Sequence, residues 1–303
     1  SPRSSASPGN VICLDGENGE TIWNTEIFRQ EGETAPRIHS KNSHARPTPV
    51  IHDGHAYVHF GHQGTAAVDL TGKVIWKGQP VAYRPVHGNG GSPVVFDDLL
   101  IFSTDGAKGQ KLNALNRHAG ELVWQTKRNI ERPKKFAFCT PLVIEVGGRP
   151  QVISPGAGMV GGYDPATGEE IWRVEYDGYS VVPRPGYGHG LVYISTGFDA
   201  PSVLAIRPDG KGNVTDTHVA WTLKRGAPHS PSLLLVGEEL TMVSDRGVAT
   251  CVDAKTGEMH WQERLGGKYS ASPIYAGGKI YCQSEEGVGI VLAAGKEFQE
   301  IAR

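Results

Sequence analysis

Cysteine is scarce in this chain, with four among 303 residues, and no two of them form a CxxC pair. No histidine stands at zinc-finger spacing from any of them, which excludes a zinc finger. Each cysteine lies in a short strand-like run, such as VICLD or AFCTP. We therefore expect small buried side chains, with a structural disulfide as the alternative, at Cys13, Cys139, Cys251 and Cys282.

Long apolar runs and basic blocks are missing as well. No stretch of about 18 apolar residues occurs, so the sequence predicts no transmembrane segment. The net charge is −2 and no Lys/Arg cluster stands out. Nucleic acid is therefore not an expected partner, because phosphate binding needs a basic surface. The chain starts with SPRSSASPGN, in which no export signal is visible.

Glycine and tryptophan, by contrast, carry a pattern. The 40 glycines and 20 prolines suit many short strands joined by tight turns. All six tryptophans follow a strand and a turn in one recurring frame, at Trp23, Trp76, Trp124, Trp172, Trp221 and Trp261. They are 53, 48, 48, 49 and 40 residues apart, which is the period of a four-stranded propeller blade. A seventh, degenerate copy has Phe298 in the tryptophan position.

Each residue type of the recurring Asp-Gly-Trp frame has a local structural role. The strand ends in an aspartate, which can bond turn amides, at Asp15, Asp69, Asp164 and Asp253. A glycine four residues before the tryptophan tolerates the positive φ of a tight turn, at Gly19, Gly72, Gly120, Gly168 and Gly257. Tryptophan then supplies apolar surface between neighbouring blades. Six tryptophans in one register indicate structure rather than a cofactor-binding set.

Six further strand pairs lie between these hairpins, so each blade would hold strands A to D. The sequence predicts an all-β fold, a β-propeller of four-stranded blades that forms a single domain over residues 1–303. Six complete blades and one half blade are expected, at 9–30 (the half blade), 45–80, 91–130, 139–178, 182–226, 229–266 and 270–303. An open propeller would expose strand edges. We therefore expect a fragment of a longer protein of seven to eight blades, or blade-completing strands from another chain.

Several motifs carry a family resemblance, namely KNSHARPTP, YVHFGHQGTAAVDL, VHGNGGSP, GYSVVPRP, RPDGKGNVTDTHVAW and SDRGVATCVDAKTG. Through them the chain resembles the PQQ-binding-like β-propeller repeat proteins of planctomycete-type bacteria. That family is similar to quinoprotein alcohol dehydrogenases and, distantly, to the outer-membrane β-barrel assembly lipoprotein. The resemblance implies export to the periplasm or the extracellular space, and it implies no particular activity. Quinoprotein enzymes carry adjacent cysteines and an acidic calcium site, which this sequence lacks, so PQQ is not an expected cofactor.

Propeller topology brings the D-to-A and B-to-C connections to one face, around the channel mouth. The D-to-A connections supply Asn42, His44, His87, Asn89, Lys134, Tyr179, Arg184, His229 and Tyr269. The B-to-C connections supply His59, His62, Asp105, Lys108, Asp199, Asp245, Arg246, Glu285 and Glu286. The A-to-B turns, on the opposite face, carry fewer polar and titratable residues. Because function commonly sits on loops held by a rigid scaffold, this polar face is the predicted ligand-binding site.

Histidines are the residues of that face with the most specific chemistry. Imidazoles can hold a divalent metal or exchange protons near neutral pH, which makes His59, His62 and His87 metal candidates. A zinc site needs a third ligand, for which His44 or His87 would serve. The alternative is that these rings bond carbonyl groups inside their own loops. No cofactor beyond this candidate metal follows from the sequence.

Two classes of function remain open. The first is an exported scaffold whose His-rich face binds a carbohydrate, a peptide or a protein. The second is a polysaccharide lyase or hydrolase, with His62 or His87 as base, Tyr179 or Tyr269 as acid and Arg184 as a carboxylate clamp. No complete catalytic motif is present, which favours binding over catalysis. The long C-to-D loop at 207–218 is expected to project from the outer part of its blade.

Overall fold

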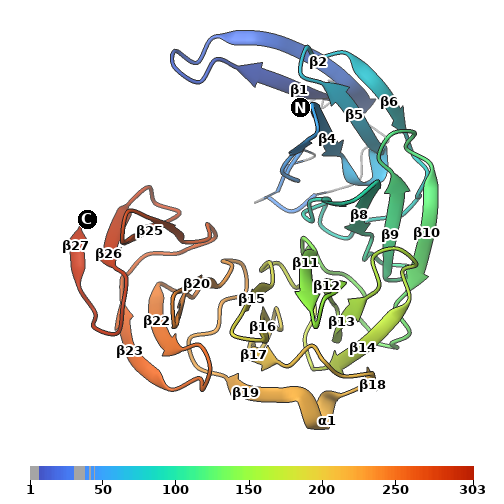
Figure 1. Cartoon of the computed structure of the whole chain (residues 1–303). Coiled ribbons are helices and arrows are strands. Elements are labelled where there is room, and N and C mark those ends of the chain that lie inside the picture. Colours follow the sequence, from blue (N-terminus) through green and yellow to red (C-terminus); the bar gives the residue numbers. More distant parts are fainter. Residues whose placement is uncertain (1–6, 31–37, 41, 44) are drawn as a thin grey trace. The chain divides into compact units, whose positions relative to one another are not determined.

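The computed structural model describes residues 7–30, 38–40, 42–43 and 45–303. These residues form one two-stranded sheet, five four-stranded sheets and one five-stranded sheet. The strands of each sheet follow one another along the chain, as the colours of Figure 1 show, with the added strand β18 as the exception. This repeated antiparallel sheet is the blade of a β-propeller, so the predicted fold class is confirmed.

Two compact units divide the chain. Unit 1 comprises Ser1–Asn129 with Pro165–Gly168, and unit 2 comprises Ile130–Asp164 with Glu169–Arg303. The organisation of residues 1–303 as a single domain stays a prediction. In the described part of the chain no helix has the length and hydropathy needed to span a bilayer.

Unit 1 holds three sheets. The first is the predicted half blade, with β1 (Ser7–Leu14) and β2 (Thr21–Gln30). The second contains β3 (Val50–His52), β4 (His55–His59), β5 (Thr65–Asp69) and β6 (Val74–Gly78), with the 3-10 turn η1 (Gly61–Gln63) between β4 and β5. The third contains β7 (Val94–Phe96), β8 (Leu99–Ser103), β9 (Lys111–Asn116) and β10 (Leu122–Lys127).

Unit 2 holds four sheets. The first contains β11 (Leu142–Val146), β12 (Arg149–Gly156), β13 (Met159–Tyr163), β14 (Glu170–Glu175) and β18 (Gly212–Asn213). The second contains β15 (Gly186–Gly188), β16 (Leu191–Ser195), β17 (Val203–Ile206) and β19 (Val219–Leu223), with the one-turn helix α1 (Thr215–His218) before β19. The third contains β20 (Leu234–Val236), β21 (Glu239–Val243), β22 (Val248–Asp253) and β23 (Met259–Arg264). The fourth contains β24 (Ile274–Ala276), β25 (Lys279–Gln283), β26 (Gly289–Ala293) and β27 (Glu300–Ala302).

The cores lie between successive sheets of each unit. In unit 1, Val11 and Ile27 of the half blade meet Ala56, Ala66 and Val68 of the next sheet. In unit 2, the β11–β14 and β15–β19 sheets share the largest core cluster in the same way. Because strand side chains alternate between faces, a middle strand with a sheet on either side serves two such cores, as β16 does with Val192 and Ile194 in one cluster and Leu191 and Tyr193 in the next. The cysteines are all free, and Cys139, Cys251 and Cys282 are buried as expected. Cys13 is only half-buried, contrary to the expectation.

The tryptophan frame couples each blade to the next. The indole N–H of Trp23 donates to the carbonyl oxygen of Leu70, one repeat later, at 2.9 Å. The turn glycine of that next repeat, Gly72, has a φ of +88° and lies against the same ring, where a Cβ would be 2.7 Å from it. The glycine therefore provides both the turn conformation and room for the neighbouring ring. The pattern recurs at Trp76, Trp124 and Trp221.

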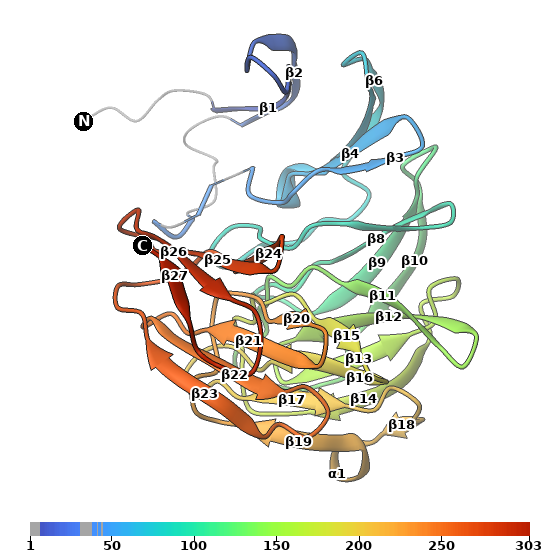
Figure 2. The same cartoon turned by 60° about the vertical axis from the view of Figure 1, so that its left-hand side comes forward.

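The blade that precedes the long C-to-D loop departs from this pattern. Trp172 donates to Gln151 Oε1 at 2.8 Å, and Gln151 Nε2 donates to the carbonyl oxygen of Pro208 at 3.2 Å. The glutamine thus relays the contact across the longer turn. The loop does not project as expected, because β18 pairs in parallel with the edge strand β14 (Figure 2). An unpaired strand edge is a site for unwanted pairing, which the returning loop covers.

Candidate binding site

The predicted site residues divide between the two units. Unit 1 contains His59, His62, His87, Asn89, Asp105 and Lys108, and unit 2 contains Tyr179, Arg184, His229, Asp245 and Glu285. His44 lies outside the described residues. The groups considered for lyase chemistry are thus split, with the histidines in one unit and Tyr179 and Arg184 in the other.

His59 closes strand β4 and is 4% exposed. Its Nδ1 lies 2.9 Å from Thr65 Oγ1, and its ring packs on Phe102 with centroids 4.3 Å apart. Burial lowers the pKa of this imidazole to about 3, because a charge would lose its hydration. Its Nε2 has no hydrogen-bond partner among the described residues. The ring is therefore a neutral, buried group that faces the next blade.

The other described histidines of the face make separate contacts. His62 lies in η1, with its Nε2 3.1 Å from Gln30 Nε2. His87 is exposed and meets the ring of His39 at a centroid distance of 5.7 Å. Partial burial and the neighbouring His39 lower the pKa of His87. Across the part of the chain that the structure describes, no three metal-ligating side chains gather into a cation site. The metal candidates therefore stay a sequence prediction.

Asn89 is another predicted site residue of unit 1 that is buried. Its Oδ1 accepts a hydrogen bond of 2.6 Å from Tyr83, and its Nδ2 lacks a partner among the described residues. Burial, together with the nearby Asp105, raises the pKa of the Tyr83 phenol. Gly61 lies so close to both side chains that a Cβ there would be 2.5 Å from Asn89 and 3.2 Å from the phenol oxygen. Tyr83 is a contributor that sequence reasoning missed.

Asp105 forms a fully buried ion pair. Arg128 donates from Nε to Asp105 Oδ1 at 3.1 Å and from Nη2 to Oδ2 at 3.2 Å, and neither side chain is exposed to solvent. The amide of Lys111 donates to the same carboxylate at 3.0 Å. The Asp105 carboxylate therefore bonds groups of the protein interior and does not face a ligand. Lys108 is exposed on the same loop.

Three predicted residues of unit 2 hold loops in place. Asp245 accepts the backbone N–H of His229 at 2.7 Å, which is a structural use of its carboxylate. Glu285 is bonded by the hydroxyl of Ser270. The amide of Arg184 donates to Ser232 Oγ at 3.0 Å, while its side chain is exposed.

Tyr179 belongs to a chain of aromatic contacts in unit 2. We name it the aromatic cluster, consisting of Phe138, Phe136, Tyr179, Phe198 and His229. Successive ring centroids are 5.9, 5.5, 5.8 and 5.3 Å apart, at interplanar angles of 55° to 75°. Phe136 and Phe138 are tilted, and the other three contacts are the edge-to-face arrangements that aromatic quadrupoles favour. The cluster joins two predicted residues, Tyr179 and His229, through rings that sequence reasoning overlooked.

A lysine completes the aromatic cluster. Lys134 Nζ lies 3.8 Å from the Tyr179 ring centroid and donates to its hydroxyl at 2.5 Å. It also lies 4.0 Å from a carboxylate oxygen of Asp199. The phenol, as the largest effect, and Asp199 raise the pKa of Lys134, so the ammonium stays charged. Lys134 and Tyr179 are 45 residues apart, about the length of one blade, and this spacing is the feature of the sequence that could have indicated their contact.

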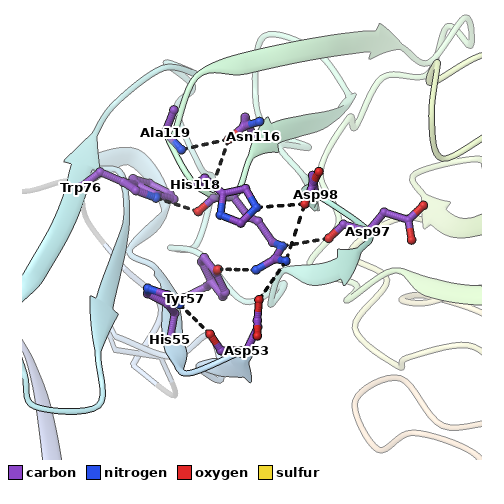
Figure 3. A network of polar contacts seen from close by, with 10 residues as sticks. Asp53, His55, Tyr57, Trp76, Asp97, Asp98, Asn116, His118 and Ala119 are labelled. Carbon is purple, nitrogen blue, oxygen red and sulfur yellow. Dashed lines mark hydrogen bonds and ion pairs between the residues drawn. The ribbon is translucent and has the colours of Figure 1, made fainter.

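The A-to-B turns of unit 1 carry more polar contacts than the sequence suggested (Figure 3). Arg117 donates from Nε to the carbonyl oxygen of Asp97 at 2.9 Å, and its Nη2 lies 3.3 Å from Asp53 and 3.6 Å from Asp98. His118 Nε2 is 2.9 Å from Asp98, and this bond lowers the pKa of that carboxyl. The buried cation thus ties the turns of two sheets together.

Comparisons with known proteins place these features in a family. The sequence profile described as outer membrane protein assembly factor BamB matches residues 4–141 and 156–296. A curated relative, outer membrane protein assembly factor BamB of Legionella pneumophila (strain Paris), is 27% identical over 203 residues, covering 65% of this chain. The match covers 49% of the relative, so the chain spans about half of its length.

Solved structures share the fold. BamB from Moraxella catarrhalis aligns with a TM-score of 0.68 and 16% identity, over 94% of this chain and 78% of that one. The quinohemoprotein alcohol dehydrogenase ADHIIG from Pseudomonas putida HK5 aligns with a TM-score of 0.63 and 14% identity, over 97% of this chain and 61% of that one. At such identities the likeness shows the β-propeller alone.

Proposed function

The chain belongs to the family of outer membrane protein assembly factor BamB, and we propose that it is a protein-binding scaffold of the bacterial cell envelope. The observation that carries the proposal is the family match over both stretches of the chain, 4–141 and 156–296. An assembly factor would act by holding other proteins, and the family name supports a location in the cell envelope. Carbohydrate binding and catalysis on polysaccharides have no such support.

The side-chain contacts are consistent with binding rather than catalysis. Asp105, Asp245 and Glu285 are engaged in bonds that fix loops. His59 is buried and neutral, so it is poorly placed to exchange protons with a solvent-borne substrate. By contrast, Phe198 is 48% exposed, and exposed aromatic residues are enriched in protein interfaces.

Quinone chemistry is not part of the proposal. The four cysteines are far apart in sequence, so no adjacent pair is available beside a quinone. The described residues also contain no acidic cluster able to hold a calcium ion. The proposal therefore names no quinone cofactor, although the repeat resembles that of the quinoprotein enzymes.

Purification from native envelopes tests the proposal. The full protein, tagged and expressed in its own bacterium, is extracted in mild detergent after fractionation of the cells. We expect it in the envelope fraction with a discrete protein in near-stoichiometric amount. The Phe198→Ala variant should lose that protein, while Tyr275→Ala, which removes a side chain that is also 48% exposed, should retain it. A chain that elutes alone, or is found only in the cytosol, would overturn the proposal.

A further inference from the structure

The aromatic cluster lies apart from the hydrophobic cores of the two units. Phe136, Phe138, Tyr179 and Phe198 belong to none of the hydrophobic cores found among the described residues. Phe198 is 48% exposed and the other three are partly exposed. Fully burying a Phe side chain stabilises a fold by about 1.5–3 kcal/mol, and the exposed Phe198 forgoes much of that gain. An exposed ring beside three partly exposed ones is apolar surface of the kind that marks interaction sites.

Backbone hydrogen bonds hold the rings in fixed positions. The amide of Ser180 donates to the carbonyl oxygen of Phe136 at 2.8 Å, and the amide of Phe138 donates to that of Val181 at 2.7 Å. The amide of Phe198 donates to the carbonyl oxygen of Tyr179 at 2.8 Å. Three loop segments are thus tied into one platform, which lowers the entropy that binding would cost.

Local strain accompanies this platform. Ser180 has a φ of +54° and Asp199 a φ of +78°, and each directly follows a ring residue of the aromatic cluster. Residues other than glycine seldom adopt this left-handed region, which costs on the order of 1–3 kcal/mol each. The surrounding hydrogen bonds maintain both conformations. Strain of this type concentrates at ligand clamps and other functional sites.

The charges beside the rings satisfy one another. Lys134 contacts both the Tyr179 ring and Asp199, so the pair presents little net charge to a ligand. An acidic or basic ligand would therefore gain little electrostatic attraction from this pair. The platform is therefore complementary to an uncharged, apolar, extended chain.

We propose that the aromatic cluster binds a proline-rich extended segment of the partner protein. This inference rests on the proposed function and names the partner chemistry at one site. Proline-rich chains form polyproline II helices, which dock against aromatic-lined surfaces. They are preformed in solution, so they lose little entropy on binding, and their carbonyl groups are free to accept hydrogen bonds. The Lys134 ammonium and the Tyr179 hydroxyl are the donors on this platform.

Peptide titration of the full chain tests the inference. The probes are fluorescently labelled decaproline, a (Gly-Ser)5 peptide of equal length, and cellohexaose. Decaproline should bind saturably while the other two do not. Phe198→Ala should weaken decaproline binding at least about tenfold, which corresponds to about 1.4 kcal/mol, and Tyr275→Ala should leave it unchanged. Raising the salt from about 50 to 500 mM should change the dissociation constant by less than about threefold, because no ion pair forms.

Other outcomes would overturn the inference. These are no decaproline binding up to about 1 mM, equal binding by Phe198→Ala, or cellohexaose binding that depends on Phe198. Strong salt dependence that is lost in Arg184→Ala would point to a charged ligand instead. If decaproline fails while the envelope partner is still held through Phe198, the inference alone is wrong. If no envelope partner exists, the proposed function itself is wrong.

Discussion

Gly257 lies directly against the indole ring of Trp221, so that a Cβ on the glycine would be only 2.7 Å from the ring. The two residues come from consecutive repeats, and the Trp221 N–H bonds the carbonyl oxygen of Ala254 in the same turn at 3.0 Å. Glycine is required here for its φ of +73° and, separately, for the space that the ring needs. This dual demand explains the fixed spacing of glycine and tryptophan in the repeat.

Gly257→Ala should therefore destabilise more than its backbone conformation alone predicts. Gly148 is the matched control, since it has a φ of +75° in the same unit and open space around it. We expect Gly148→Ala to cost about 1 kcal/mol and Gly257→Ala about 2–4 kcal/mol of unfolding free energy. Urea denaturation of both variants measures the difference. Equal costs would show that the ring does not constrain the turn.

Acid should weaken the fold through His59. Burial holds the pKa of this imidazole at about 3, whereas the unfolded chain titrates near 6.5. The unfolded state therefore takes up the proton first, and stability falls as the pH drops below about 6.5. The loss between pH 7 and pH 5 should be about 2 kcal/mol larger in the wild type than in His59→Asn. His52→Asn, at an exposed position of β3, is the control. Identical pH profiles for His59→Asn and the wild type would contradict the burial of a neutral ring.

The buried ion pair should show strong coupling. Asp105→Leu or Arg128→Met alone leaves an uncompensated charge inside unit 1, at a cost of about 3–5 kcal/mol. The double variant should be more stable than either single one, because no charge is left behind. Lys108→Ala, on the exposed part of the same loop, should change stability by less than about 0.5 kcal/mol. Thermal unfolding of the four proteins gives the cycle, and additive single effects would disprove the pairing.

Thiol reactivity should separate the cysteines. Burial raises the pKa of both Cys251 and Cys282 to about 11, so neither forms appreciable thiolate at pH 8. Cys139 is fully buried, and Cys13 alone is partly exposed. A native sample treated with Ellman's reagent should release about one equivalent, and Cys13→Ser should release almost none. Two or more equivalents from the native wild type would show that the blades open readily.

The fold could be predicted from the sequence because its signals are local and repeated. A turn aspartate, a glycine and a tryptophan lie within nine residues of one another, as in Asp15 to Trp23, and their spacing recurs along the chain. The loop at 207–218 was misjudged because its pairing partner, β14, belongs to the preceding sheet. No local sequence pattern predicts the pairing of β14 with β18.

The candidate site was harder to predict because its contacts cross between blades. Sequence reasoning selected Asp105 but missed its partner Arg128, and it selected Tyr179 without Phe136 or Phe198. Lists of polar residues cannot show which charges neutralise each other or which aromatic rings stay exposed. Residues about one blade apart do meet, so pairing positions at that spacing is the signal that was available.

Site-specific photo-crosslinking in living cells tests the central claim most directly. A photoreactive amino acid replaces Phe198 in the full-length protein and, as the matched position, Tyr275. A scaffold that binds protein through the aromatic cluster predicts one discrete crosslinked partner from position 198 and none from position 275. Equal, diffuse crosslinking at both positions, or none at either, would contradict a protein-binding role for this surface.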